Sequence, residues 1–259
     1  MSKNVLHKGI DVSYAQGKID WSKVKDKIDF AIIRCGFGGN YTSQDDTQFL
    51  NNIKGCQKYN IPYGIYHYSY ATTVEKAKDE AAHVIRLLRG LKPSLPVFYD
   101  LEESRISALG KSKILEIAKT FCYEIEKAGY TYGTYCNTNW YNNYLTDKWY
   151  DSKVKWLAQY NSKVTYKGKY DIWQYSCTGK VDGIKGDVDM NFCYISLKEG
   201  DVNGDGKVTA ADARQILRIS SGLEKTSGQS ALNADVNNDG EITAADARIA
   251  LRISAGLEE

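Results

Sequence analysis

The sequence predicts an α/β protein of two parts, an irregular (β/α) barrel of about eight strands and a small all-α domain after it. Two observations support this prediction. Short apolar segments alternate with helical segments over roughly the first 190 residues, which is typical of βαβ units and a parallel sheet. The last part of the chain instead contains two copies of one polar loop followed by a helix. We place the domains at residues 1–197 and 198–259.

Eight short apolar segments are predicted to be strands, and the helices between them are lost in the last third of the barrel. The predicted strands are residues 9–13, 30–37, 62–70, 96–103, 131–137, 155–160, 171–176 and 187–192. The last three follow one another too closely to leave room for helices. The predicted helices begin at 20–24 and continue at 47–59, 74–89 and 112–128, the last closed by Gly129.

The fourth predicted strand delivers two carboxylates, Asp100 and Glu102, at its end. In a strand, residues i and i+2 point to the same face, roughly 6.5–7 Å apart. Like charges this close raise the pKa of at least one carboxyl group, and burial raises it further. Glycoside hydrolysis is the commonest chemistry that needs one protonated and one ionised carboxyl. The simpler alternative is that both acids are solvated residues after a strand.

Four acids are predicted to converge on one rim of the barrel. A barrel places reactive groups at the C-terminal ends of its strands. The acids at or near such ends are Asp11, Asp100, Glu102 and Asp189. The alternative fold, a doubly wound open sheet, is less favoured because neither G-x-G-x-x-G nor a P-loop follows the first strand.

The composition is ordinary for a soluble globular protein, with 42% hydrophobic and 25% charged residues. Twenty tyrosines and five tryptophans are many for 259 residues, and suit either core packing or a carbohydrate groove. The net charge is uneven: residues 199–259 hold six basic and eleven acidic side chains (−5), and the remainder holds 28 and 21 (+7). The acidic tail suits cation binding. Without a basic run or a recognised motif, we expect no nucleic-acid partner.

No apolar stretch is long enough to span a membrane, and residues 1–30 lack the apolar core of a signal peptide. We therefore expect either an intracellular protein or a protein whose signal peptide was replaced in this sequence. Six cysteines show neither C-x-x-C nor zinc spacing, and most lie in apolar segments as small core residues. Cys177 and Cys193, which flank the final turn, are the disulfide to test first.

Residues 201–222 and 235–256 are two copies of one loop–helix unit, offset by 34 residues. Oxygen side chains at loop positions 1, 3, 5, 9 and 12, a glycine at 6 and a main-chain carbonyl at 7 match an EF-hand calcium loop. Position 12 is aspartate instead of the usual glutamate. Thr209 and Thr243 can also cap the helices that follow. The predicted ligands of two calcium ions are Asp201, Asn203, Asp205, Lys207, Thr209, Asp212, Asp235, Asn237, Asp239, Glu241, Thr243 and Asp246.

This repeat resembles a dockerin domain of type I, which docks a secreted enzyme onto a cohesin module of a scaffold protein. The resemblance covers the whole segment and implies two equivalent partner-binding sets. Many dockerins carry hydroxyl residues where this chain has Ala-Ala, which leaves the type of partner open. The two sets are identical here, so we expect binding in two orientations related by a half turn. They are Ala210, Ala211, Leu217 and Arg218, and Ala244, Ala245, Leu251 and Arg252.

Four motifs follow one another along residues 9–195. They are Gly9-Ile-Asp11-Val-Ser13-Tyr-Ala-Gln16, Tyr99-Asp100-Leu-Glu102, Trp173-Gln174-Tyr175 and Val188-Asp189-Met-Asn191. Together, and in this order, they resemble family 25 glycoside hydrolases, the N,O-diacetylmuramidase type of lysozyme. The resemblance implies cleavage of the β-1,4 bond between N-acetylmuramic acid and N-acetylglucosamine in peptidoglycan. We expect no cofactor in the barrel.

The residues suggest roles for the four acids. Glu102 is predicted to be the general acid, its pKa raised by its acidic neighbours. Asp100 is predicted to stay ionised and to orient either the substrate's N-acetyl carbonyl or a water. Asp11 and Asp189 would keep the pKa of the acid high. His67 is expected to be a hydrogen-bonded core residue. Candidates to bind sugar, with core packing as the alternative for each aromatic, are Tyr66, Tyr68, Tyr135, Trp156 and Gln174.

The combined prediction is a secreted, extracellular muramidase with a monomeric barrel, tethered to a scaffold or cell surface and without membrane insertion. One alternative is a barrel that grips peptidoglycan or chitin without cutting it. Another is a hydrolase that acts on chitin. A third concerns the tail alone, where the calcium loops would only stabilise the fold.

Overall fold

The structure is a computed structural model that describes residues 6–226 and 228–258. The chain divides into two compact units, the first ending at Tyr194 and the second beginning at Ile195. The sequence placed this boundary after residue 197. Each unit has an apolar core of its own.

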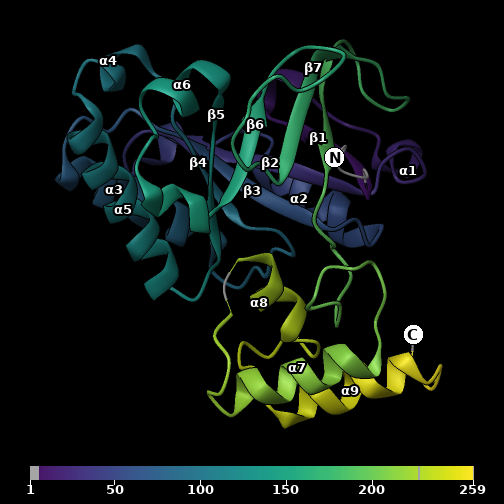
Figure 1. The fold of residues 1–259 in the computed structure, drawn as a ribbon. Helices are drawn as coiled ribbons and strands as arrows, with labels where there is room; N and C mark the ends of the chain where they lie inside the picture. The colour runs from purple at the N-terminus through teal and green to yellow at the C-terminus, as the bar shows by residue number, and fades with distance from the viewer. Residues whose placement is uncertain (1–5, 227, 259) are drawn as a thin grey trace. The chain divides into compact units, whose positions relative to one another are not determined.

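Eight strands of the first unit close into a barrel, in which each strand pairs with the next along the chain and β8 pairs with β1 (Figure 1). The strands are β1 His7–Val12, β2 Phe30–Phe37, β3 Tyr63–Tyr68, β4 Val97–Asp100, β5 Tyr132–Asn137, β6 Val154–Ala158, β7 Ile172–Gly179 and β8 Val188–Cys193. Eight strands in a barrel were predicted, and the fold is confirmed.

The helices of this unit follow the first five strands, and no α-helix lies between β6 and β8 in the described residues, as predicted. The long helices α3 and α5 lie side by side against the barrel (Figure 1). The helical segments are η1 Tyr14–Gln16, α1 Trp21–Val24, η2 Thr42–Gln44, α2 Phe49–Lys58, α3 Val74–Leu88, α4 Ser104–Ser107, α5 Lys111–Lys127, α6 Thr138–Asn143 and η3 Lys148–Ser152.

The direction of β8 differs from the expectation of a parallel sheet. Strands β1 to β7 are parallel, whereas β8 runs antiparallel to both β7 and β1. A parallel connection needs about a dozen residues or more, and only residues 180–187 join β7 to β8. The first residues of β8 therefore lie at the rim where the other strands end. Asp189 reaches that rim from the beginning of its strand, not from the C-terminal end expected from the sequence.

The alternation of side chains along β4 separates the two layers of the core. Tyr99 faces the helices, where its ring stacks on Phe121 with centroids 3.8 Å apart. Phe98 fills the barrel interior, where its ring lies 5.3 Å from that of Trp156. A Cβ on Gly133 of β5 would lie 2.7 Å from the Phe98 ring, so this position needs glycine. By the same alternation Asp100 shares the inner face with Phe98.

The predicted disulfide between Cys177 and Cys193 is wrong. Cys177 is an exposed free thiol, whereas Cys193 is buried. The register of β7 and β8 places Cys193 opposite Ile172, at the other end of β7 from Cys177. No helix in the described part of the chain is long and apolar enough to cross a lipid bilayer.

The second unit contains two long helices that pack on each other, α7 Ala210–Ser220 and α9 Ala244–Ser254, and the short α8 Gln229–Ala234. Thr209 and Thr243 cap α7 and α9 in complete capping boxes with Asp212 and Asp246, as predicted.

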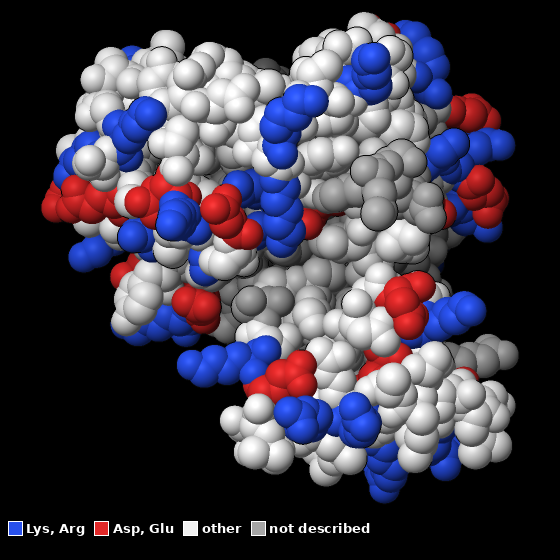
Figure 2. All heavy atoms as spheres, in the orientation of Figure 1, with Lys and Arg blue, Asp and Glu red and all other residues white. Residues whose placement is uncertain are grey.

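On the face drawn in Figure 2, basic and acidic side chains are interspersed and do not gather in one large patch of either sign.

Candidate active site

The rim of the barrel gathers the four predicted acids. Asp11 lies opposite Asp189 in the register of β1 and β8. Asp100 is the last residue of β4, and Glu102 lies in the loop that follows, not in the strand. Burial raises the pKa of all four carboxyl groups, and their mutual repulsion raises that of Asp11, Asp100 and Glu102 further. The acids therefore act on one another, although they come from three distant parts of the chain.

Asp11 and Asp189 form a pair of carboxyl groups that lie opposite each other in the register of β1 and β8. Each shifts the pKa of the other, and repulsion between two carboxylates favours a state in which one of them is protonated. Asp11 is only 4% exposed. Burial and the Asp189 charge raise the pKa of Asp11 well above its usual range, so Asp11 is the better holder of the proton. Asp189 is less buried, and its pKa is raised mainly by burial.

Two amides hold Asp11 in place. Its Oδ2 accepts hydrogen bonds from Gln174 Nε2 at 2.9 Å and Asn191 Nδ2 at 2.8 Å. The amide oxygen of Gln174 accepts the hydroxyls of Tyr135 and Tyr160, at 2.8 and 3.0 Å. Gln174, predicted to bind sugar, is buried and positions Asp11 instead. Asn191 was not predicted as a site residue, although it lies two residues from Asp189 on the same strand.

Glu102 is partly buried and lies at a pocket, as a proton donor to a bound ligand requires. It is partly exposed and lines a pocket of about 390 Å³ together with Tyr135, Asn137 and Tyr160. Burial, followed by the Asp189 charge, raises its pKa above the usual range for a glutamate. A glutamate in these surroundings keeps its proton to higher pH and can reach a ligand in the pocket.

Asp100 is 3% exposed, and its Oδ1 has no hydrogen-bond partner among the described residues. Burial raises its pKa well above the usual range, Glu102 and Asp11 raise it further, and only Arg34 opposes them. The sequence predicted an ionised Asp100, and these surroundings instead favour its neutral form. A buried acceptor without a partner is rare in proteins and often marks a functional site.

Of the four predicted sugar-binding aromatics, two line pockets and two pack against each other. Tyr68 lines a pocket of about 450 Å³ on β2 and β3, and Tyr135 lines the Glu102 pocket. Tyr66 packs edge-on against Trp156 with centroids 5.8 Å apart, beside Asp11 and Asp100. Trp156 itself is 1% exposed and donates its Nε1–H to Asn191, so it fills the barrel and does not stack on a sugar.

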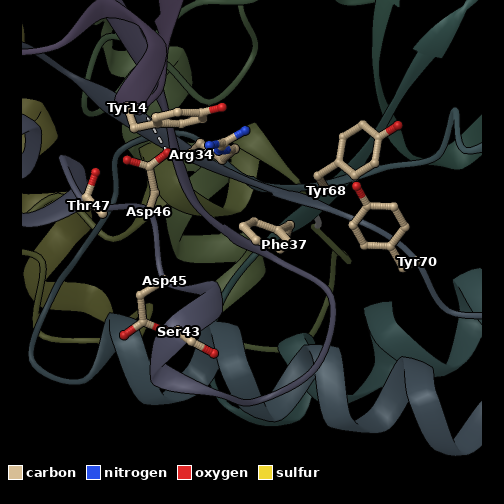
Figure 3. Close-up of a pocket in the computed structure, with 9 residues that line it drawn as sticks. All are labelled: Tyr14, Arg34, Phe37, Ser43, Asp45, Asp46, Thr47, Tyr68 and Tyr70. Carbon is tan, nitrogen blue, oxygen red and sulfur yellow. Dashed lines mark hydrogen bonds and ion pairs between the residues drawn. The ribbon is translucent and has the colours of Figure 1, made fainter.

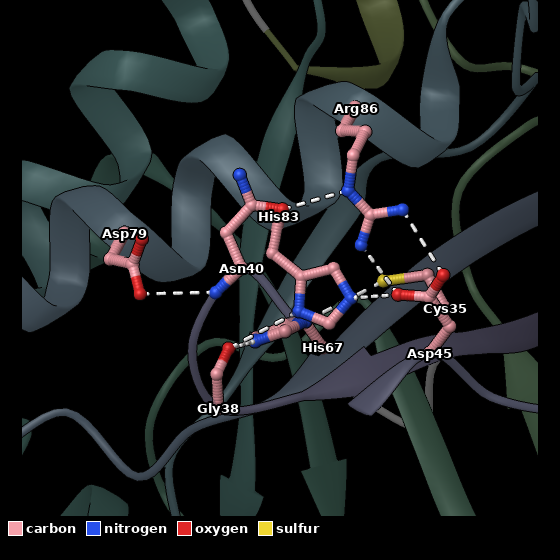
Figure 4. Close-up of polar contacts among 8 residues, drawn as sticks. All are labelled: Cys35, Gly38, Asn40, Asp45, His67, Asp79, His83 and Arg86. Carbon is pink, nitrogen blue, oxygen red and sulfur yellow. Dashed lines mark hydrogen bonds and ion pairs between the residues drawn. The ribbon is translucent and has the colours of Figure 1, made fainter. Parts of the chain in front are cut away.

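A buried polar cluster fixes the loop between β2 and α2 (Figure 4). His67 is fully buried, its Nε2 lies 2.9 Å from the carbonyl of Gly38, and burial lowers its pKa to about 3. It is the core residue that the sequence predicted. His83 and Arg86 of α3 both bind the carboxylate of Asp45, with His83 Nε2 at 2.7 Å. The loop that carries Asp45 is thus fastened to β3 through His67 and to α3 through His83 and Arg86.

The two predicted calcium loops fold around the side chains of their first and twelfth residues. The Asp201 carboxylate accepts the N–H groups of Gly204, Asp205 and Gly206, and the Asp235 carboxylate accepts those of Asp239 and Gly240. Among the described residues, no three His, Cys, Asp or Glu side chains alone could hold a metal ion. A calcium ion here would therefore also need amide and main-chain oxygens, which suit this hard cation. The donors that would complete each set are Asn203 and the Lys207 carbonyl, and Asn237 and the Glu241 carbonyl.

The predicted partner-binding residues lie on the exposed face of α7 and α9. A groove of about 370 Å³ between these helices is lined by equivalent residues of both repeats, which gives it an internal symmetry. Arg218 and Arg252 lie outside this groove and pair with Glu224 and Glu258. Arg214 and Arg248, which the sequence did not single out, lie inside it. The lining residues are Ala210, Ala213, Arg214, Leu217, Ala244, Ala247, Arg248 and Leu251.

Two sequence families match the chain. The family described as glycosyl hydrolases family 25 matches residues 10–184. The family described as dockerin type I domain matches residues 199–250. The first match covers most of the barrel and includes Asp11, Asp100 and Glu102, and it ends before β8 and Asp189. The second match covers the first loop–helix repeat and most of the second.

Individual relatives are similar to a large part of the chain. The autolytic lysozyme of Clostridium acetobutylicum is 28% identical over 228 residues, 84% of this chain and 67% of that protein. Lysozyme M1 of Streptomyces globisporus is 30% identical over 199 residues, 71% of this chain and 66% of that protein. The structure of the modular autolysin LytC of Streptococcus pneumoniae with a synthetic peptidoglycan ligand aligns with a TM-score of 0.65 at 27% identity, over 72% of this chain and 46% of that one. The chain thus spans about two thirds of each lysozyme and less than half of LytC.

Proposed function

Because the chain belongs to glycosyl hydrolase family 25, as a glycoside hydrolase of the lysozyme type, we propose that it cleaves the β-1,4 bond between N-acetylmuramic acid and N-acetylglucosamine in peptidoglycan. The observation that supports this most is the placement of Glu102. It lies at a pocket and beside three further acids at one rim. The carboxyl groups around one open site supply the acid and the charge stabilisation that glycoside hydrolysis needs.

In this proposal Glu102 protonates the leaving glycosidic oxygen. Burial and Asp189 raise its pKa, so it is still protonated at a pH where a free glutamate is ionised. Asp100 lies beside the anomeric carbon, and the positive charge that develops there favours its ionised form. Asp100 then orients either the N-acetyl carbonyl of the substrate or a water. Asp11 and Asp189 act as positioning residues through the proton that one of them holds and the amides of Gln174 and Asn191.

Product analysis tests the bond and the polymer. Purified cell walls are digested, released reducing ends are counted and the fragments are identified by mass spectrometry. Muropeptides with a new reducing N-acetylmuramic acid end are the expected products. Walls that are bound but not cut would favour the non-hydrolytic barrel. Faster cleavage of chitin oligomers than of muropeptide strands would favour the chitin-directed alternative.

We further propose that the dockerin domain binds two calcium ions and docks the enzyme onto a cohesin module outside the cell. The paired oxygen-rich loops and the symmetric groove of α7 and α9 support this. Titration of a cohesin into the full chain, with calcium and then with chelator, tests it: we expect binding only with calcium. Binding that survives chelation would contradict the role of the metal.

The symmetry of the groove suggests two equivalent modes of cohesin binding. Leu217→Asp or Leu251→Asp alone should leave most of the affinity, because the other orientation places the disturbed helix elsewhere in the interface. The double variant should lose binding. A collapse of affinity in one single variant would contradict the two-orientation proposal.

A further inference from the structure

A second pocket at the barrel rim has no part in the proposed chemistry so far. We call it the Arg34 pocket; it has a volume of about 450 Å³ and its walls include Tyr14, Arg34, Tyr68 and Tyr70 (Figure 3). Tyr68 lies opposite Asp100 in the register of β3 and β4. The pocket is therefore next to the acids, on the β2–β3 side of the rim. The volume falls in the range of about 300–1,000 Å³ that small-molecule sites occupy.

The guanidinium of Arg34 is held in a fixed orientation. Its Nε donates to Asp46 Oδ2 at 2.8 Å, and the buried Asp46 also accepts the main-chain N–H of Tyr14 at 2.9 Å and of Gln48 at 2.9 Å. The Tyr14 ring lies 4.7 Å from the guanidinium and is 57% exposed. No described residue accepts a hydrogen bond from the two terminal nitrogens of Arg34. These nitrogens form a planar pair of donors at the pocket, covered on one side by an aromatic ring.

The other charges of the pocket are already compensated. Asp46 accepts hydrogen bonds from three N–H donors, one of them from Arg34. Asp45, on the opposite wall, is bound by Arg86 and His83 from α3 (Figure 4). Tyr68 and Tyr70, whose ring centroids are 5.2 Å apart, provide an aromatic wall on which a sugar ring can pack. The terminal nitrogens of Arg34 are thus the charged donors left for a ligand.

We propose that the Arg34 pocket binds a carboxylate carried by the glycan strand, so that Arg34 is a specificity-determining residue. A guanidinium with two parallel free N–H groups matches a carboxylate in bidentate geometry. The inference rests on the proposed function, because peptidoglycan supplies this group and chitin does not. Its source is either the free lactyl carboxylate of N-acetylmuramic acid or, where that is in amide linkage, a carboxylate of the attached peptide.

Binding to three ligands in a Glu102→Gln background tests the proposal without turnover. The ligands are peptide-free muramic-acid oligomers, peptide-bearing oligomers and chitin oligomers of the same length. Adding Arg34→Gln should weaken binding of at least one carboxylate-bearing ligand about 10- to 100-fold, as loss of hydrogen bonds to a charged group does. Chitin binding should be unchanged. Loss confined to the peptide-free ligand identifies the lactyl group, and loss confined to the peptide-bearing ligand identifies the peptide.

Two further variants separate recognition from structure. Arg34→Lys keeps the charge beside Asp46 but not the planar fork, and should recover only part of the affinity. Arg89→Gln removes an exposed arginine at the C-terminal end of α3, which does not line the pocket, and should change none of the three affinities. An equal loss on all three ligands would mean that Arg34 acts through Asp100 or the fold, and would overturn the proposal, as would no loss. If cell-wall digestion fails while the discrimination persists, the proposed hydrolysis is wrong and the carboxylate site remains.

Discussion

The barrel and the dockerin domain differ in the size of their apolar cores. Every strand of the barrel pairs with two others. Apolar layers lie both in the barrel interior and between the sheet and its helices. The dockerin core contains mostly small side chains; its buried members are Val202, Val208, Ala213, Ile216, Ala234, Val236, Ala247 and Ala250. A domain of this size buries a smaller fraction of its surface than a larger one, and often needs a metal or a partner. We therefore expect the barrel to stand alone and the dockerin to depend on calcium.

The same contrast holds for the functional sites. The acids of the barrel come from β1, β8 and the end of β4, so their arrangement depends on the whole sheet. Each predicted calcium loop consists of twelve consecutive residues and is held by hydrogen bonds among them. A change in one unit should therefore leave the other nearly untouched.

The largest expected effect is that of Glu102→Gln on catalysis. Loss of a general acid typically lowers turnover about 10²- to 10⁴-fold, and the partly exposed Glu102 can be replaced without opening a cavity. Turnover on peptidoglycan should fall by this factor, with unchanged melting temperature and unchanged cohesin binding. The control is Glu103→Gln, an adjacent glutamate that pairs with Arg105 and lines neither the Glu102 pocket nor the Arg34 pocket. A Glu102→Gln enzyme with more than about a tenth of the activity would remove this residue from the acid role.

Calcium removal should act on the dockerin alone. A ligand at about 1,000 times its Kd stabilises the folded state by about 4 kcal/mol, and chelation removes this contribution. We expect the thermal transition of the dockerin to move down or disappear, and the transition of the barrel to stay in place. Calorimetry of the full chain with and without chelator measures both. A barrel transition that shifts as much as that of the dockerin would contradict the comparison.

A matched pair of core variants compares the stability margins of the two units. Ile117 on α5 and Ile216 on α7 are both fully buried isoleucines in helices. Replacing either with alanine costs about 2–5 kcal/mol. The barrel should remain folded after Ile117→Ala, whereas Ile216→Ala should unfold the dockerin at room temperature and abolish cohesin binding. Native-state proteolysis detects the difference, and equal resistance in both variants would argue that the units have similar margins.

The smallest expected effect is a change in pH dependence. Burial and then the Asp189 charge raise the pKa of Glu102. Asp189→Asn removes the charge, so the pKa of Glu102 falls and the acid loses its proton at lower pH. The alkaline limb of the kcat/KM profile should move to lower pH. Asp187→Asn, which removes an exposed acid paired with Lys180, serves as the control. An alkaline limb that stays in place would separate Asp189 from the tuning of the acid.

Most of the fold could be predicted because its signals are local. Apolar segments and amphipathic helices gave the order of elements, and α3 and α5 begin and end within a residue of their predicted limits. The direction of β8 could not be predicted from its own residues, since Val188–Cys193 has the same pattern in either direction. It depends on the short connection and on pairing with β1 at the far end of the chain. The burial of Trp156 could not be predicted either, because an aromatic residue in a barrel strand suits a core and a groove equally well.

The sequence by itself determined the two-part organisation, the calcium-loop pattern and the identity of the four acids, because each depends on a pattern of residues that are close together in the chain. Only the tertiary structure decided which carboxylates meet. Asp11 faces Asp189 because β8 runs backwards, Asn191 and Gln174 reach Asp11 across the barrel, and Asp46 holds Arg34 at a pocket beside Asp100. These contacts join residues from 12 to 180 positions apart. Their geometry follows from closing the sheet into a barrel and packing the barrel interior, and no local sequence pattern predicts it.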